Sequence, residues 1–171
     1  LEASLERTLS SLGAARFSFD VRCRFAVESE ADAAMDSVRR AIATLSGVGI
    51  VADVVQTGGG GPNRKVAQLA AVVGDADVLV VADSDVDLAG VDLDVLVAPL
   101  WGDGAAWVSW APPVECATPR TWGDRASQAV LGASLHSFPI LARIDSRGLV
   151  GKLFAIRREA LFAIGGFGSL V

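Results

Sequence analysis

The stretch that most constrains the fold of this chain is the apolar run at residues 78–82, which ends in an acidic pair. The run reads Val-Leu-Val-Val-Ala, and Asp83-Ser84-Asp85 follow it directly. A short, mostly β-branched run without polar alternation predicts a strand that is buried on both faces of a sheet. In α/β sheets, ligands bind outside the carboxyl ends of the strands. The run therefore places Asp83 and Asp85 at an edge where a ligand is expected.

The acidic pair has two interpretations. Asp83 and Asp85, separated by one small residue, can offer hard oxygen ligands to Mg²⁺ or Mn²⁺, and the cation can in turn hold a diphosphate. The same residues also suit an ordinary acidic turn after a core strand. An Asp-x-Asp pattern is too short to choose between the two by itself.

Composition excludes several classes of protein. The 171 residues are 51% hydrophobic with a mean hydropathy of +0.45, which suits one domain over residues 1–171 with a full hydrophobic core. The net charge of −5 argues against nucleic-acid binding, which requires a basic face. Cys23 and Cys116 lie far apart without metal-binding spacing, so both are expected to be small core residues. No apolar run is long enough to span a bilayer and no signal peptide opens the chain, so the chain as given is expected to be soluble.

Alternating strand and helix patterns predict an α/β fold with a mostly parallel sheet. The apolar spacing at the very start of the chain predicts a helix. Because an α/β domain commonly starts with a strand, we expect that a first strand is missing. A helical turn is also expected from residue 157, closed by Gly165-Gly166. Helices are expected at residues 1–12, 33–45, 63–73, 91–100 and 121–135, and strands at 19–27, 48–55, 78–82, 107–110 and 149–156.

A basic turn after a run of glycines is a candidate phosphate site. Asn63, Arg64 and Lys65 follow the glycines at residues 58–61 and open a helix, whose free N–H groups attract anions. The stricter phosphate-loop pattern is absent, because Val66 stands where a hydroxyl residue is required. A flexible loop with a solvated basic turn is the alternative interpretation.

Two further candidates lie elsewhere in the chain. Glu28 and Asp32 follow the strand at residues 19–27 and form a second acidic group at a second strand end. His136 is the only histidine and stands near the end of the helix expected at residues 121–135. A histidine at such a position is either structural or functional. No Ser/His/Asp arrangement can be argued, because His136 would be the only base.

The order of these motifs resembles ceramide glucosyltransferase and its bacterial relatives in families 21 and 2, which include hopanoid-biosynthesis glycosyltransferases. The similarity runs over nearly the whole chain. The joint order is more specific than any one motif. Its parts are the acidic strand end, the Gly-rich loop with Pro62-Asn63-Arg64-Lys65-Val66, then Val81-Ala82-Asp83-Ser84-Asp85-Val86, and finally Gly151-Lys152-Leu153-Phe154-Ala155-Ile156-Arg157-Arg158-Glu159-Ala160-Leu161 with Gly165-Gly166.

The resemblance implies a GT-A nucleotide-sugar fold and inverting, metal-assisted transfer from a UDP-sugar to a lipid hydroxyl. It implies contact of the nucleotide with Asp32, with Glu28 as the other candidate. The basic turn at Asn63, Arg64 and Lys65 would add to donor binding. Asp83 would meet the diphosphate and the Mg²⁺ or Mn²⁺, with Asp85 completing the metal site. A family histidine of the acceptor region falls close to His136.

The resemblance also has departures. The family's third acidic site, which is expected to be the general base, has no counterpart before Val171, and the Gln/Arg-x-x-Arg-Trp motif and the membrane segments are missing too. These departures imply an incomplete catalytic domain. The longer protein would act at the cytoplasmic face of a membrane, reached through segments absent here. Since a positioned base contributes about 10²–10⁴-fold, this chain alone is expected to be inactive.

Two other classes of function are alternatives to sugar transfer. One is a nucleotide-sugar-binding module without catalysis. The other is a nucleotidyltransferase, which shares the sheet and the metal carboxylates. That class usually carries a Gly-rich signature after its first strand, and this chain does not show one.

Overall fold

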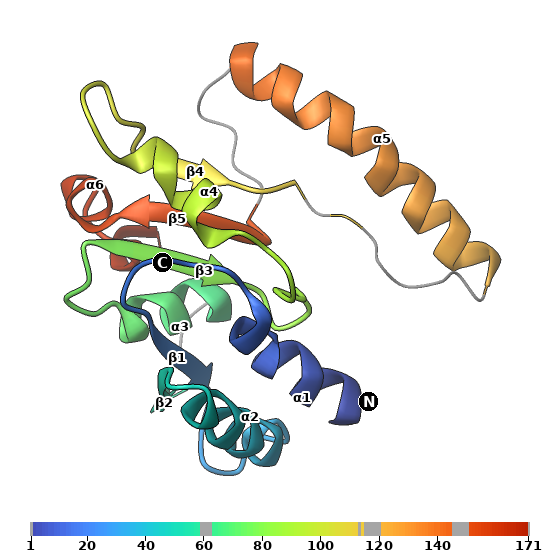
Figure 1. Ribbon diagram of the computed structural model, residues 1–171, viewed down its shortest axis with the longest axis vertical. Coiled ribbons are helices and arrows are strands. Elements are labelled where there is room, and N and C mark those ends of the chain that lie inside the picture. The colour runs from blue at the N-terminus through green and yellow to red at the C-terminus, as the bar shows by residue number, and fades with distance from the viewer. Residues whose placement is uncertain (1, 59–62, 113, 115–120, 145–150, 171) are drawn as a thin grey trace.

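The structure is a computed structural model, which describes residues 2–58, 63–112, 114, 121–144 and 151–170. The described residues confirm the predicted alternation of strands and helices (Figure 1). The helices are α1 (Glu2–Ser10), α2 (Met35–Gly47), α3 (Arg64–Val72), α4 (Leu93–Val97), α5 (Trp122–Ile144) and α6 (Arg158–Ala163), with 3₁₀ turns η1 (Ser11–Ala14), η2 (Ala98–Leu100) and η3 (Phe167–Leu170). The strands are β1 (Arg22–Val27), β2 (Val51–Gln56), β3 (Val78–Ala82), β4 (Val108–Trp110) and β5 (Leu153–Arg157).

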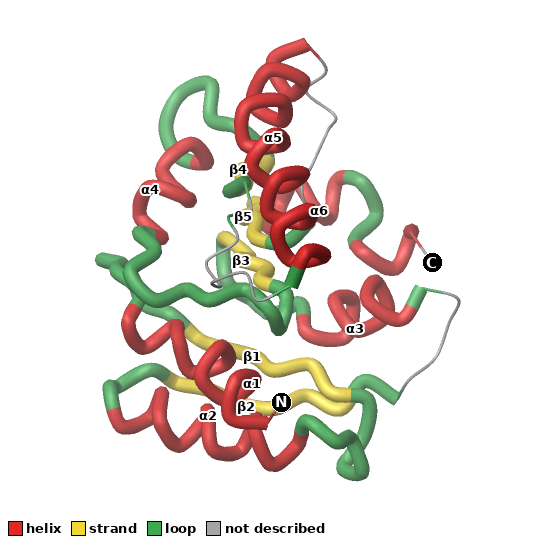
Figure 2. Tube along the Cα trace, turned by 90° about the vertical axis from the view of Figure 1, so that its right-hand side faces the viewer, coloured by secondary structure: helices red, strands yellow, loops and turns green. Residues whose placement is uncertain are grey.

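The strands form two separate sheets among the described residues. β1 and β2 pair in parallel, while β5 lies between β3 and β4 and is antiparallel to both. Figure 2 shows the β1–β2 pair beneath the three-stranded sheet. The prediction of a mostly parallel sheet is therefore wrong, since β1 and β2 are the only parallel neighbours among the described strands.

The reversed direction of β5 has a topological cause. β4 ends at Trp110, which pairs with Phe154 near the start of β5. The chain therefore leaves β4 and enters β5 at the same end of the two strands, so β5 must run antiparallel to β4. Apolar periodicity identifies a strand but carries no information about its direction.

Burial also differs from the prediction for residues 78–82. β5 is the most buried strand, with Leu153, Phe154 and Ala155 inside the core. β3 pairs on one side only, and Val80 is 37% exposed. The prediction of a strand buried on both faces is therefore wrong for β3, because one of its edges borders a groove described below.

The helices begin and pack where local chemistry dictates. Asn63 caps α3 by accepting a hydrogen bond from the Val66 N–H at 3.2 Å. α1 packs across α2, and α2 buries a stripe spaced at helical intervals. That stripe consists of Met35, Val38, Ala41 and Leu45.

α5 is longer than predicted and stands apart from the sheets in Figure 1. The helix continues beyond residue 135 and through Pro139 to Ile144. His136 therefore lies inside α5 and not near its end, and its side chain is outside the described residues. Phe138 meets Trp110 of β4 edge to face, with ring centroids 6.4 Å apart. Among the helices of the described ranges, none is both long and apolar enough to cross a bilayer.

Candidate functional site at the carboxyl ends of β1 and β3

A groove of about 1160 Å³ is lined by residues of β1 and β3 and by residues that follow both strands. Its lining includes most of both strands together with side chains of α1, α2 and α3. Charged residues gather where the strands end. They are Asp32, Lys65, Asp83, Asp85 and Lys152. The structure thus brings four of the predicted site residues to one cavity and adds Lys152.

Asp83 is held at the start of the loop that follows β3. Its N–H donates to the Lys152 carbonyl at 2.9 Å, which extends the β3–β5 ladder by one residue. Its carboxylate lies 2.5 Å from Lys65 Nζ and 3.6 Å from Lys152 Nζ. The Asp83 side chain is only 24% exposed. Two ammonium groups therefore flank a carboxylate whose backbone is fixed by the sheet.

Asp85 and Lys152 form the outer part of the same cluster. Lys152 Nζ lies 2.5 Å from Asp85, whose side chain is 66% exposed. The hydrogen bond to Asp85 raises the pKa of Lys152, and the negative charge of Asp83 acts in the same direction. Lys152 is consequently a cation at every physiological pH. Sequence reasoning assigned it no role, because only the antiparallel pairing of β5 with β3 places it beside the acidic pair.

The three residues of the basic turn at the start of α3 make different contacts. Asn63 caps the helix, as described above. Arg64 pairs with Glu28, which follows β1. Lys65 reaches the site, where Nζ contacts Asp83 and also donates to the Gly151 carbonyl at 3.0 Å. Of the predicted phosphate-binding turn, Lys65 is the residue that meets the acidic pair.

Asp32 has a clear structural role in the turn between β1 and α2. Its two carboxylate oxygens accept the N–H groups of Glu28 at 3.2 Å and Ala34 at 2.9 Å. This pattern is an aspartate-stabilised turn. Each oxygen retains capacity for another hydrogen bond, so the structural role and a ligand contact are compatible.

Comparison with known families identifies the class of protein. The profile described as "Glycosyl transferase family 21" matches residues 1–171, the whole chain. The chain belongs to glycosyl transferase family 21. The predicted resemblance to the ceramide glucosyltransferase-like family is confirmed by this match. No curated protein and no solved structure matches the chain. Family membership implies a transferase that uses a nucleotide-sugar donor and an acceptor.

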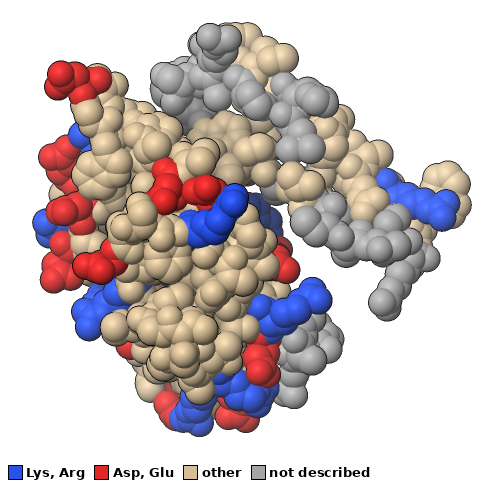
Figure 3. All heavy atoms as spheres, viewed as in Figure 1, with Lys and Arg blue, Asp and Glu red and all other residues tan. Residues whose placement is uncertain are grey.

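The charges of this family 21 chain bear on metal binding. Among the residues that the structure describes, no three His, Cys, Asp or Glu side chains come together as a metal cage. Mg²⁺, however, is commonly bound by one or two carboxylates together with substrate phosphates and water. Asp83 and Asp85 supply two carboxylates, the number that such a shared site uses. Figure 3 shows acidic and basic side chains mixed on one face of the molecule.

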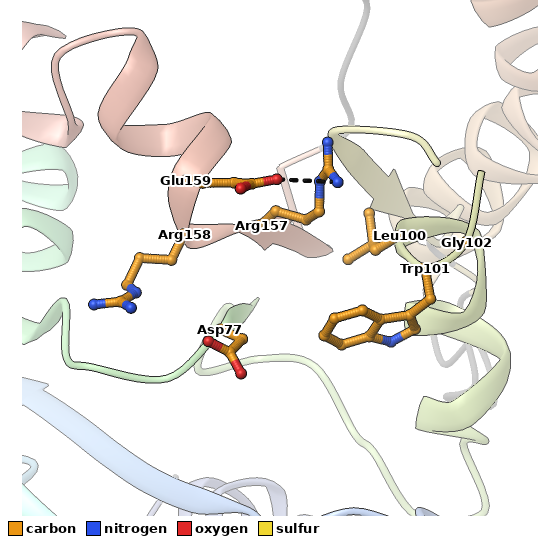
Figure 4. Close-up of a pocket in the computed structure, with 7 residues that line it drawn as sticks. All are labelled: Asp77, Leu100, Trp101, Gly102, Arg157, Arg158 and Glu159. Carbon is orange, nitrogen blue, oxygen red and sulfur yellow. Dashed lines mark ion pairs between the residues drawn. The ribbon is translucent and has the colours of Figure 1, made fainter. Parts of the chain in front are cut away.

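A smaller cavity of about 280 Å³ lies at the other end of β3 in the family 21 chain. Asp77, Trp101 and Arg157 are among its lining residues (Figure 4). Arg157 already pairs with Glu159 at 3.0 Å. Because Asp77 precedes β3 and Asp83 follows it, this cavity and the acidic cluster lie at opposite ends of β3.

Cys23 of the family 21 chain lines the groove and is expected to be unreactive. Burial, with a contribution from the negative charge of Asp53, raises the pKa of Cys23 to about 12. In a Cys116→Ser background, thiol labelling at pH 8 should be at least about tenfold slower in the folded chain than in urea, since the thiolate is the reactive form. Labelling of the folded chain at the rate seen in urea would contradict this prediction.

The raised pKa of Cys23 also predicts a contribution to the free energy of unfolding. That contribution is complete below about pH 9 and is lost as the pH rises to about 12.

Proposed function

We propose that this family 21 chain binds the donor of an inverting glycosyltransferase of GT-A fold, which transfers a sugar from a UDP-sugar to a lipid hydroxyl. The observation that carries the proposal is the charged cluster that lines the groove just after β3. There, Asp83 and Asp85 face Lys65 and Lys152, which come from two other parts of the chain. Such a cluster offers carboxylates to a cation and ammonium groups to phosphate oxygens.

Each residue has a proposed role in donor binding. Asp83 and Asp85 would hold Mg²⁺ or Mn²⁺. A bound divalent cation would neutralise charge that develops on the departing diphosphate. Lys65 and Lys152 would turn from the carboxylates to the phosphate oxygens, which their long side chains permit. Asp32, with Glu28 beside it, would accept a hydrogen bond from the uracil ring.

We place the lipid acceptor near α5. This helix exposes large apolar side chains, which suit a lipid better than a polar acceptor, and His136 lies within it. We infer that the transferase acts at the cytoplasmic face of a membrane, as the resemblance implies. The exposed apolar residues are Trp122, Val130, Ile140, Leu141 and Ile144.

Calorimetric titration with UDP and UMP, each with and without Mn²⁺, tests the donor site. We expect UDP to bind at least about tenfold more weakly without Mn²⁺, since one charge-assisted contact accounts for about that factor. UMP, which lacks the second phosphate, should bind more weakly than UDP by a similar factor. Equal binding of UDP and UMP, or binding of UDP that ignores Mn²⁺, would contradict the proposed diphosphate site.

A further inference from the structure

The cavity of about 280 Å³ at the other end of β3 from the acidic cluster has no part in the proposed function. Three segments that are distant in the sequence meet there. They are Asp77 before β3, residues 100–102 at the end of η2, and residues 157–159 where β5 passes into α6. The lining carries two positive and two negative side chains besides the indole of Trp101. Because these charges balance, the cavity does not suit a ligand with a large net charge.

Hydrogen bonds fix the backbone on two sides of this cavity. Arg158 N–H donates to Asp77 O at 2.8 Å, which joins the start of α6 to the residue before β3. Trp101 N–H donates to Ala98 O at 3.3 Å. Gly102, at φ 87°, then takes the left-handed conformation that favours glycine. The lining side chains therefore project from a backbone that is already in place, which lowers the entropy cost of binding.

Arg157 has an unused donor beside the cavity. Its Nη1 pairs with Glu159 at 3.0 Å, whereas its Nε is buried and has no hydrogen-bond partner in the described part of the chain. A buried donor without a partner costs free energy. Nε and Nη2 lie on the same side of a guanidinium group, and together they match two oxygens of a carboxylate or phosphate. Arg157 can therefore bind one oxyanion while it keeps its pair with Glu159.

The opposite side of the cavity suits a cation. Figure 4 shows Arg157 and Glu159 on one side of the cavity and Asp77 and Trp101 on the other. Trp101 is 56% exposed, and the face of an indole ring attracts ammonium groups. Asp77 is exposed, and its carboxylate makes no ion pair within the described residues, nor does the guanidinium of Arg158. One side thus offers donors to an oxyanion, and the other offers a carboxylate and an aromatic ring to an ammonium group.

We propose that this cavity binds a zwitterion in which a phosphodiester and an ammonium group are joined by a short linker, as in a phosphocholine headgroup. Arg157 and Arg158 bind the phosphodiester, and Asp77 and Trp101 bind the ammonium group. The balanced lining disfavours a phosphate monoester, which carries a second negative charge. An α-amino acid, whose charged groups share one carbon atom, suits opposite sides of a cavity less well. The proposal does not rest on the donor site, which lies at the other end of β3.

NMR titration with glycerophosphocholine, a soluble zwitterion of this class, tests the proposal. We expect saturable shifts at the amides of Gly102 and Arg158 and at the indole N–H of Trp101. Choline and dimethyl phosphate, which each carry one half of the ligand, should bind at least about threefold more weakly, because even an exposed cation–π contact contributes about that factor. Equal binding of the zwitterion and either half, or no shift at these positions, would overturn the proposal.

Substitutions on the two sides of the cavity locate the ligand. Asp77→Asn should weaken glycerophosphocholine binding about threefold. Asp75→Asn is the matched control and should leave binding unchanged, since Asp75 is equally classed as exposed but does not line this cavity. Arg157→Lys keeps the positive charge and loses the Nε donor, so it should weaken glycerophosphocholine about tenfold and leave choline unaffected. Equal affinities of the Asp77→Asn and Asp75→Asn variants would also overturn the proposal.

Vesicles distinguish a lipid headgroup from a free zwitterion. If the ligand is a lipid, phosphatidylcholine vesicles should sediment the chain, and both glycerophosphocholine and Asp77→Asn should reduce the sedimented fraction. Phosphatidylglycerol vesicles, whose headgroup lacks the ammonium group, serve as the control. If the ligand is a free zwitterion, glycerophosphocholine should bind as above, while phosphatidylcholine vesicles sediment the parent chain and the Asp77→Asn variant equally or not at all.

Discussion

Asp83→Asn is expected to weaken Mn²⁺-dependent binding of UDP by roughly 10- to 100-fold. The substitution keeps the size of the side chain and removes its charge. Contacts to a charged group contribute about 1.5–3 kcal/mol, and about 1.4 kcal/mol corresponds to tenfold in affinity. Asp83 should matter more than Asp85, because it is 24% exposed and contacts both lysines, whereas Asp85 is 66% exposed. Solvent weakens the more exposed contact.

The matched control for this measurement is Asp103→Asn. Asp103 lies in an exposed turn before β4 and does not line the groove. The Asp103→Asn substitution removes the same charge from the chain, so an effect of net charge alone on UDP binding would appear in both variants. Calorimetry with UDP and Mn²⁺ should find Asp103→Asn close to the parent chain. An Asp83→Asn variant that binds as tightly as Asp103→Asn would remove Asp83 from the proposed site.

Leu45→Ala is expected to lower the free energy of unfolding by about 2–5 kcal/mol. Leu45 is 0% exposed and belongs to the core that joins α2 to η1 and α4. Truncation loses the transfer energy of the buried atoms and leaves a cavity that the surrounding helices fill only in part. Urea unfolding followed by circular dichroism measures the change, with the slope compared between variants.

Leu141→Ala provides the matched control, since it deletes the same atoms from an exposed position. Leu141 is 56% exposed on α5. Its truncation should change stability by no more than about 0.5 kcal/mol, as is usual at surface positions. If the two variants are equally stable, α2 does not pack on the core in the way described.

Local chemistry in the sequence was enough to predict many elements. The apolar run at residues 78–82 is a strand, and the helical spacing from Met35 to Leu45 forms α2. Asn63 stands where a helix cap is expected and caps α3. These features depend on residues within one or two turns of each other, so the information that fixes them is local. The order of motifs likewise identified the family that the profile match confirms.

The tertiary structure decided which strand is central and what meets the acidic pair. The burial expected of β3 belongs to β5, which enters between β3 and β4 in the reverse direction. That reversal brings Lys152 to Asp83 and Asp85 across a long separation in sequence. The length of α5 and the groove between β1 and β3 were also decided at this level. Apolar patterns specify which residues seek burial, whereas strand direction and pairing partner depend on where the connecting chain returns to the sheet.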